Sequence, residues 1–96
     1  GKIYSNMSSI DLLASKARIE ILRELSRRDM YVRQLMDAVG MDGTTAKHHL
    51  DALESAGVVS SYEEGRRRYY TLEREIVFQV SPAPNRRFVL QVRDPS

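Results

Sequence analysis

The sequence predicts an α+β domain in which a run of helices is followed by two β-hairpins. Apolar residues recur at helical spacing through residue 56, with glycine at positions 40 and 57, where helices would end. From residue 58 the pattern changes to short runs rich in valine and aromatic residues, which are typical of strands. Near the end of the chain, the pentapeptides IVFQV and FVLQV are near copies on either side of a proline-containing loop.

Length and composition limit the chain to one small domain. It has 96 residues, of which 42% are hydrophobic and 29% charged, and it contains no cysteine. A chain of this length buries only roughly 60 to 65% of its unfolded surface, so a deep substrate pocket would compete with the core. The absence of cysteine excludes disulfides, thiolate metal sites and thiol redox chemistry.

No apolar run approaches the ~18 residues of a membrane span, and we expect a cytoplasmic protein without membrane association.

The first helical pattern covers residues 8–28, without proline or glycine. Ser15 leaves two alternatives open: one continuous helix, or a short helix followed by a longer one that begins near Lys16, because serine is a weak helix former and a good N-cap. We expect the helix to end at Arg27 and Arg28, since cations are favoured at a helix C-terminus.

The next two helical patterns are separated by a short glycine-containing turn. Residues 31–39 form the first, which ends at Gly40, a residue suited to the left-handed conformation. Asp42 is placed to cap the next helix, over residues 44–56. Two helices joined in this way form a helix-turn-helix, in which the second helix can enter a DNA major groove.

Residues 58–63 and 66–72 predict two strands joined by a tight turn at Glu64-Gly65. This turn places Val59 opposite Tyr70. Alternation then puts Val59, Tyr70 and Leu72 on the inner face, and Tyr62, Arg67 and Tyr69 on the outer face. The helices of residues 8–56, four of them if the first segment divides at Ser15, and such a hairpin predict a winged helix-turn-helix over residues 1–75.

Residues 76–96 predict a C-terminal β-rich extension. The two near-copy pentapeptides are expected to pair as a second hairpin. Its apolar residues exceed what the edge of so small a core needs, and an isolated hairpin is marginal in water. We therefore expect this extension to belong to the same domain or to the interface of a homodimer.

The third helix presents the main candidate binding face. At 100° per residue its buried stripe contains Ala46, His49, Leu50, Leu53 and Ala56. The opposite face carries short hydrogen-bonding residues and one cation, which allow a close approach to base edges; its candidate DNA-binding residues are Thr44, Thr45, Lys47 and His48. The alternative interpretation is that this face is simply exposed to solvent and binds nothing. The preceding turn, the predicted hairpin and the arginine cluster favour DNA binding over this alternative.

Arg66, Arg67 and Arg68 stand at the tip of the predicted first hairpin. A tip arginine can reach a phosphate or a narrow minor groove, where the negative potential is enhanced. Alternation turns Arg67 outward, and we favour a DNA contact for it. For Arg66 and Arg68, pairing with Glu63 and Glu64 is an equal alternative.

The remaining polar residues indicate no catalytic or metal site. His48 and His49 are adjacent and diverge on a helix, whereas metal ligands on one helix are three or four residues apart. We expect His49 to be a boundary core residue that is hydrogen-bonded within the fold. Arg18 is expected to pack its stem and pair with an acid such as Glu54 or Asp51. Without a nucleophile set or a glycine-rich phosphate loop, the sequence predicts neither an enzyme nor a cofactor.

The region from Ser15 to Leu72 resembles the winged helix-turn-helix domain of the ArsR-type transcriptional regulators. The matching stretches are SKARIEILREL, VRQLMDAVGMDGTTAKHHLDALESAGVV and SYEEGRRRYYTL. The most specific residues of the match are Thr44, Thr45, His49, Leu50, Leu53 and Gly57.

This resemblance implies double-stranded DNA binding through the third helix and the wing, and a homodimer. It carries over Thr44, Thr45, Lys47 and His48 as groove residues and Arg67 as a wing contact. Two departures limit it: without cysteine, metal sensing is not implied, and a β-rich segment stands where members of the family usually carry a C-terminal dimerisation helix.

The charge distribution leaves a second function open. Residues 29–61 carry two basic and five acidic side chains, and Asp51 lies on the exposed face of the third helix. A winged helix that binds proteins without binding DNA is the alternative to a DNA-binding regulator.

Overall fold

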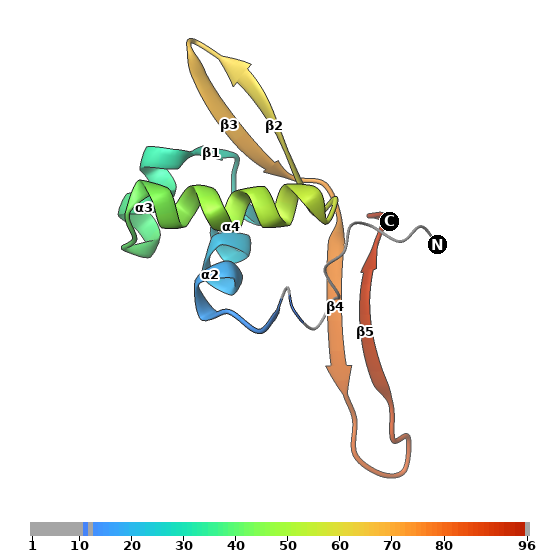
Figure 1. The fold of residues 1–96 in the computed structure, drawn as a ribbon. Helices are drawn as coiled ribbons and strands as arrows, with labels where there is room; N and C mark the ends of the chain where they lie inside the picture. The colour runs from blue at the N-terminus through green and yellow to red at the C-terminus, as the bar shows by residue number, and fades with distance from the viewer. Residues whose placement is uncertain (1–10, 12, 96) are drawn as a thin grey trace.

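The computed structural model describes residues 11 and 13–95 and has the predicted α+β architecture, a winged helix-turn-helix followed by a second hairpin (Figure 1). The helices and strands follow one another in the order α2 (Lys16–Leu25), β1 (Met30–Tyr31), α3 (Val32–Val39), α4 (Gly43–Ser55), β2 (Val59–Glu64), β3 (Arg67–Leu72), β4 (Glu75–Val80) and β5 (Phe88–Arg93). No helix in the described part of the chain is long and apolar enough to cross a membrane.

Helix α2 is capped by Ser15, begins at Lys16 and is shorter than predicted at its C-terminal end. The Ser15 hydroxyl accepts a hydrogen bond from the backbone N–H of Arg18 at 3.3 Å, so of the two alternatives the helix starting near Lys16 is the one formed. Residues 8–10 of the predicted segment lie outside the described residues. The helix ends at Leu25 because the chain turns at Ser26 and brings Met30, which is 1% exposed, into the core.

Strand β1 was not predicted. Met30 lies opposite Tyr70 and Tyr31 opposite Tyr69, so β1 extends the wing to a three-stranded sheet of order β1-β3-β2. A strand of two residues has no alternation that a sequence pattern could reveal, and the first turn of the next helix follows it directly.

The predicted turn between α3 and α4 is confirmed. Gly40 ends α3 in the left-handed conformation, with φ of 78°. Asp42 caps α4 by accepting a hydrogen bond from the backbone N–H of Thr45 at 2.7 Å, and this bond lowers the pKa of the Asp42 carboxyl.

The turn of the wing lies one residue later than predicted. Gly65 and Arg66 both have positive φ, 59° and 67°, as a two-residue hairpin loop of type I′ requires. Glu64 therefore pairs with Arg67, and Val59 lies opposite Leu72 instead of Tyr70. The register moves by two residues, which leaves the faces unchanged, and the predicted inner face of Val59, Tyr70 and Leu72 is confirmed.

The core lies between the three helices and the inner face of the wing sheet, with Tyr70, Ile21 and Leu50 fully buried in it. The second hairpin, β4–β5, is formed as predicted and contacts this core at its base through Ile76 and Val92. Figure 1 shows the two hairpins extending in opposite directions from the helices, which gives the molecule dimensions of 52 × 27 × 24 Å.

Candidate nucleic-acid interface

The predicted binding face of α4 is exposed and rigidly supported. Thr44, Thr45, Lys47 and His48 all lie on its exposed side. On the opposite side Ala46, Leu50 and Leu53 are completely buried. The helix is therefore fixed to the core along one side and presents short polar side chains on the other.

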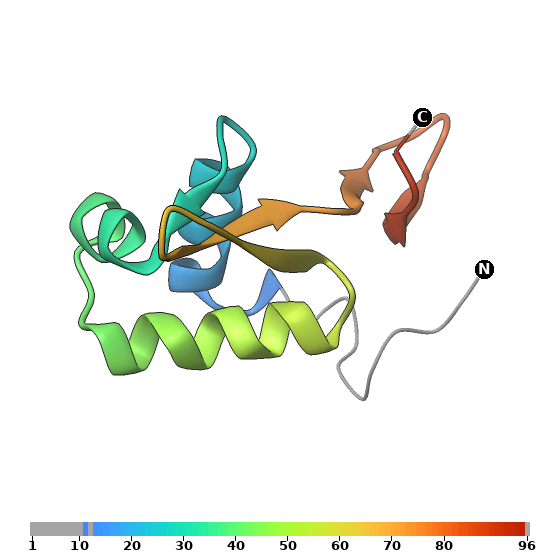
Figure 2. The ribbon, with the colours of Figure 1, turned by 90° about the horizontal axis from the view of Figure 1, so that it is seen from above.

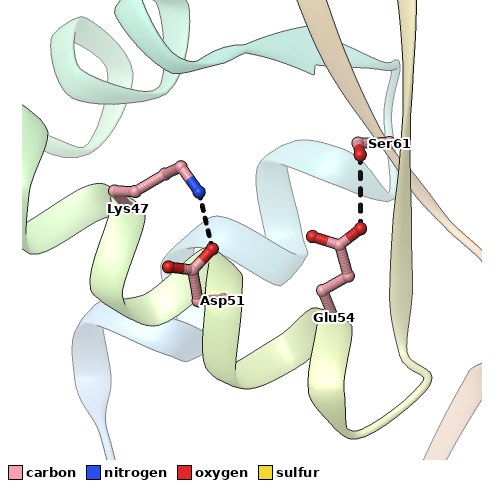
Figure 3. Close-up of polar contacts among 4 residues, drawn as sticks. All are labelled: Lys47, Asp51, Glu54 and Ser61. Carbon is pink, nitrogen blue, oxygen red and sulfur yellow. Dashed lines mark hydrogen bonds and ion pairs between the residues drawn. The ribbon is translucent and has the colours of Figure 1, made fainter.

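An open hollow of about 470 Å³ lies on this face, lined by Gly43, Thr44, Lys47, His48 and Asp51. Within it the Lys47 ammonium donates a hydrogen bond to Asp51 at 2.7 Å (Figure 3). This bond, together with the nearby hydroxyl of Tyr70, raises the pKa of Lys47. Lys47 thus remains a cation, but its charge is partly neutralised by the acid one turn further along α4.

Two side-chain contacts fix α4 to its neighbours. Glu54 accepts a hydrogen bond from the Ser61 hydroxyl of β2 at 3.2 Å (Figure 3). On the other side, Arg18 of α2 donates from Nε to Nδ1 of His49 at 3.0 Å. Burial and the adjacent Arg18 charge lower the pKa of His49, which favours the neutral imidazole that can accept this bond.

The prediction for His49 is confirmed, and the residue bonded to it is Arg18, for which the sequence had suggested an acid such as Glu54 or Asp51. Arg18 donates to an imidazole, while the two acids proposed for it bond to Lys47 and Ser61. The sequence could not indicate this pairing, because the two residues lie 31 positions apart on different helices.

The three wing arginines occupy different environments. Arg66 lies in the turn itself and is exposed. Arg68 forms an ion pair across the strands with Glu63 at 3.7 Å, which is the structural alternative considered for it. The guanidinium carbon of Arg67 lies 4.6 Å from the centroid of the Tyr31 ring, on the outer face of the sheet. The wing rises beside α4, with its tip toward the end of the molecule where α4 begins (Figures 1 and 2).

Arg67 belongs to a row of aromatic side chains that we call the tyrosine ladder, formed by Tyr31, Tyr69 and Tyr62. The rings of Tyr31 and Tyr69 meet edge to face at 5.5 Å, and those of Tyr69 and Tyr62 stack at 5.6 Å. The Tyr62 hydroxyl donates to Asp29 at 2.6 Å, and this bond raises the pKa of Tyr62 to about 12.

Sequence reasoning found only part of the ladder. Strand alternation turned Tyr62, Tyr69 and Arg67 to one face, but Tyr31 was assigned to the start of a helix. No signal in the sequence places Tyr31 in a strand, because Met30 and Tyr31 are too few to show alternation and α3 follows them directly.

Comparisons with known proteins identify the family. The profile described as "Bacterial regulatory protein, arsR family" matches residues 15–61, from the N-cap of α2 into β2. The HTH-type transcriptional regulator Rv0324 of Mycobacterium tuberculosis is 40% identical over 65 residues, which is 68% of this chain and 29% of that protein. The chain belongs to the ArsR family.

Solved structures agree with this assignment. The NMR structure of the homodimeric winged helix-turn-helix DNA-binding domain of Mb0332 from Mycobacterium bovis matches with a TM-score of 0.62 and 38% identity, over 67% of this chain and 59% of that one. A crystal structure of a fragment from M. bovis, described as a possible transcriptional regulatory protein, matches with a TM-score of 0.61 and 38% identity, over 67% of this chain and 69% of that one.

The ArsR-family match ends in the wing, so β4–β5 lies beyond the residues that the profile covers. The chain spans less than a third of the full regulator to which it is 40% identical. Since the family consists of transcriptional regulators, it agrees with the prediction that the chain is not an enzyme.

Proposed function

We propose that this ArsR-family chain binds double-stranded DNA at specific sequences as a transcriptional regulator, with α4 in the major groove and the wing on the phosphate backbone or in the minor groove. The observation that carries the proposal is the position of the exposed polar face of α4 beside the arginine-bearing wing tip. In this arrangement one helix and one hairpin can contact neighbouring grooves of the same duplex.

The two elements contribute different contacts. Thr44, Thr45, Lys47 and His48 supply short donors and acceptors that can read base edges in the major groove. Arg67, Arg66 and Arg68 supply charges for phosphates, which position the protein without reading sequence. Asp51 holds Lys47 in the free protein. A carboxylate without a partner is repelled by nearby phosphates. On DNA, Asp51 would therefore either stay bonded to Lys47 or accept a hydrogen bond from a cytosine amino group.

The protein acts as a homodimer in this proposal. The related domain from Mycobacterium bovis is described as homodimeric. A two-fold axis would allow two copies of α4 to meet successive major grooves about 34 Å apart.

The test is a titration of fluorescent duplexes across a salt series, first with mixed genomic DNA and then with the site enriched from it. Alanine at Thr44 or His48 should cost about 1–3 kcal/mol on the preferred site and little on random DNA. Ser55→Ala is the matched control, because Ser55 is exposed near the other end of α4. If these α4 substitutions and Arg67→Ala leave the affinity for every duplex unchanged, the DNA-binding proposal is wrong.

A protein-binding winged helix is the second candidate. It is favoured by the acidic balance of residues 29–61 and by the pairing of Lys47 with Asp51, which reduces the positive charge of the α4 face. A protein without measurable duplex binding at 50 mM salt would support this candidate over DNA binding, because sequence-independent phosphate contacts are strongest at low salt.

A further inference from the structure

One face of the β4–β5 hairpin is entirely apolar. The register pairs Ile76 with Val92, Phe78 with Leu90 and Val80 with Phe88, and alternation places all six side chains on the same side of the ribbon. We call this set the hairpin face. The opposite side carries Glu75, Gln79, Gln91 and Arg93 beside two valines.

The hairpin face is covered by the core at its base and open toward its tip. Ile76 and Val92 pack against the core. Further along the strands Phe78 is 60% exposed, Val80 63% and Phe88 67%, and the two phenylalanine rings meet edge to face at 6.0 Å. Exposed apolar side chains that gather in one patch, as these do, often mark an interaction site.

A groove of about 600 Å³ continues this surface toward α2. It is lined by Leu13, Ala14, Ile19, Phe78, Phe88 and Leu90, and Ile19 is 44% exposed. Small-molecule sites ordinarily combine apolar walls with a few polar groups that orient the ligand. The side chains that line this groove are all apolar, which favours a protein surface as the occupant.

We infer that a second copy of this chain covers the hairpin face, so that β4–β5 is the dimerisation element of the homodimer in the proposed function, on which this inference rests. A two-fold contact is self-complementary, and an apolar face that meets its own copy leaves no buried charge unpaired. The two rings alone expose roughly 250 Å² per protomer. This is about a third of the ~800 Å² per partner in a standard interface, and Val80, Leu90 and Ile19 extend the same surface.

The inferred dimer leaves the DNA-binding surface accessible. Figures 1 and 2 show that α4 begins at the end of the molecule away from β4–β5, and that the wing and the second hairpin point in opposite directions. Association through the hairpin face therefore does not cover the α4 residues proposed to contact DNA.

The first test measures the mass of the whole chain by sedimentation equilibrium between 1 and 100 µM. We expect the unchanged chain to be a dimer and the double variant Phe78→Glu/Phe88→Glu to dissociate with a Kd raised about 100-fold or more, because two carboxylates of each protomer would have to be buried. Gln79→Glu, on the opposite side of the same strand, is the matched control and should remain dimeric.

The masses distinguish failure of the hairpin face as the interface from failure of the homodimer itself. A dimer that persists in the double variant overturns the hairpin face as the interface but leaves the homodimer standing. A monomeric unchanged chain at 100 µM overturns both, and the duplex titration then decides DNA binding independently.

A second measurement avoids charge substitutions in the hairpin. The chain contains no cysteine, so Val80→Cys and Gln79→Cys each introduce a single thiol, on the hairpin face and on its opposite side. We expect alkylation of Cys at position 80 to slow several-fold as protein concentration rises through the dimer Kd, and the thiol at position 79 to react at a constant rate. Equal, concentration-independent rates at both positions would overturn the inference.

Discussion

The contact between Arg67 and Tyr31 predicts a measurable coupling between the wing and strand β1. The guanidinium carbon lies 4.6 Å from the ring centroid, on an exposed face of the sheet. A cation–π contact at such a site contributes about 0.5–1 kcal/mol. In a double-mutant cycle that combines Tyr31→Leu with Arg67→Ala, the free energy of unfolding should therefore show a coupling of this size.

The single change Tyr31→Leu removes a second contact as well. Tyr31 also meets Tyr69 edge to face at 5.5 Å, and such aromatic pairs add about 0.5–1.5 kcal/mol beyond burial. We expect Tyr31→Leu to lower the free energy of unfolding by about 1–2.5 kcal/mol in urea denaturation. Tyr31→Phe is the control, because it keeps the ring and both contacts.

The same variants test whether the tyrosine ladder holds the Arg67 side chain in the conformation that binds DNA. Ordering a free arginine on binding costs about 0.5–1.5 kcal/mol, so Tyr31→Leu should weaken duplex binding about 2- to 10-fold while Tyr31→Phe leaves it unchanged. If the leucine and phenylalanine variants have equal stability and equal affinity, the ring does not hold Arg67 and the reasoning is refuted.

Three further predictions concern charge. Arg67→Ala should weaken binding to all duplexes alike and reduce the salt slope by about one unit per protomer, whereas alanine at Lys47 or His48 should act on the preferred site; anisotropy titrations at several salt concentrations distinguish the two. Tyr62 should titrate with a pKa of about 12 in absorbance at 295 nm, and Tyr62→Phe should remove that step. Because the fold favours its protonated hydroxyl, the contribution of this group to stability is full below its ordinary pKa of 10.0 and is lost as pH rises through about 12. The pKa of Asp42 is lowered in the fold, so its contribution is present above 3.8 and lost as pH falls through the folded-state pKa; Asp42→Ala should lower Tm at pH 7 and make Tm less dependent on pH between 5 and 2.

Local signals explain which parts of the fold were predictable. Ser15, Gly40 and Asp42 act on the backbone within a few residues of themselves, so the sequence indicated the helix boundaries that depend on them. The exposed and buried faces of α4 follow from helical periodicity and were found at the predicted residues. The position of the wing turn was wrong by one residue because Glu64-Gly65 and Gly65-Arg66 both fit a two-residue loop, and only the φ values of the folded turn distinguish them.

The candidate site depended more strongly on tertiary structure. The sequence placed Thr44, Lys47 and His48 on one face, but it could not show that Asp51 holds Lys47 in the free protein. In the wing, the sequence left Arg68 with two equal alternatives, a DNA contact or an ion pair with Glu63 or Glu64. The strand register places the Glu63 carboxylate 3.7 Å from the Arg68 guanidinium.

By itself, the sequence determined a winged helix-turn-helix with a second hairpin, because caps, turns and periodicity act between residues that are close in the chain. Only the tertiary structure decided which side chains meet: Arg18 with His49, 31 positions apart, and Tyr62 with Asp29, 33 positions apart. It also decided how much of the hairpin face stays open, because Ile76 reaches the core while Phe78, two residues further along the same strand, extends beyond it. Such contacts depend on how elements pack over long separations, and no pattern within a single element encodes them.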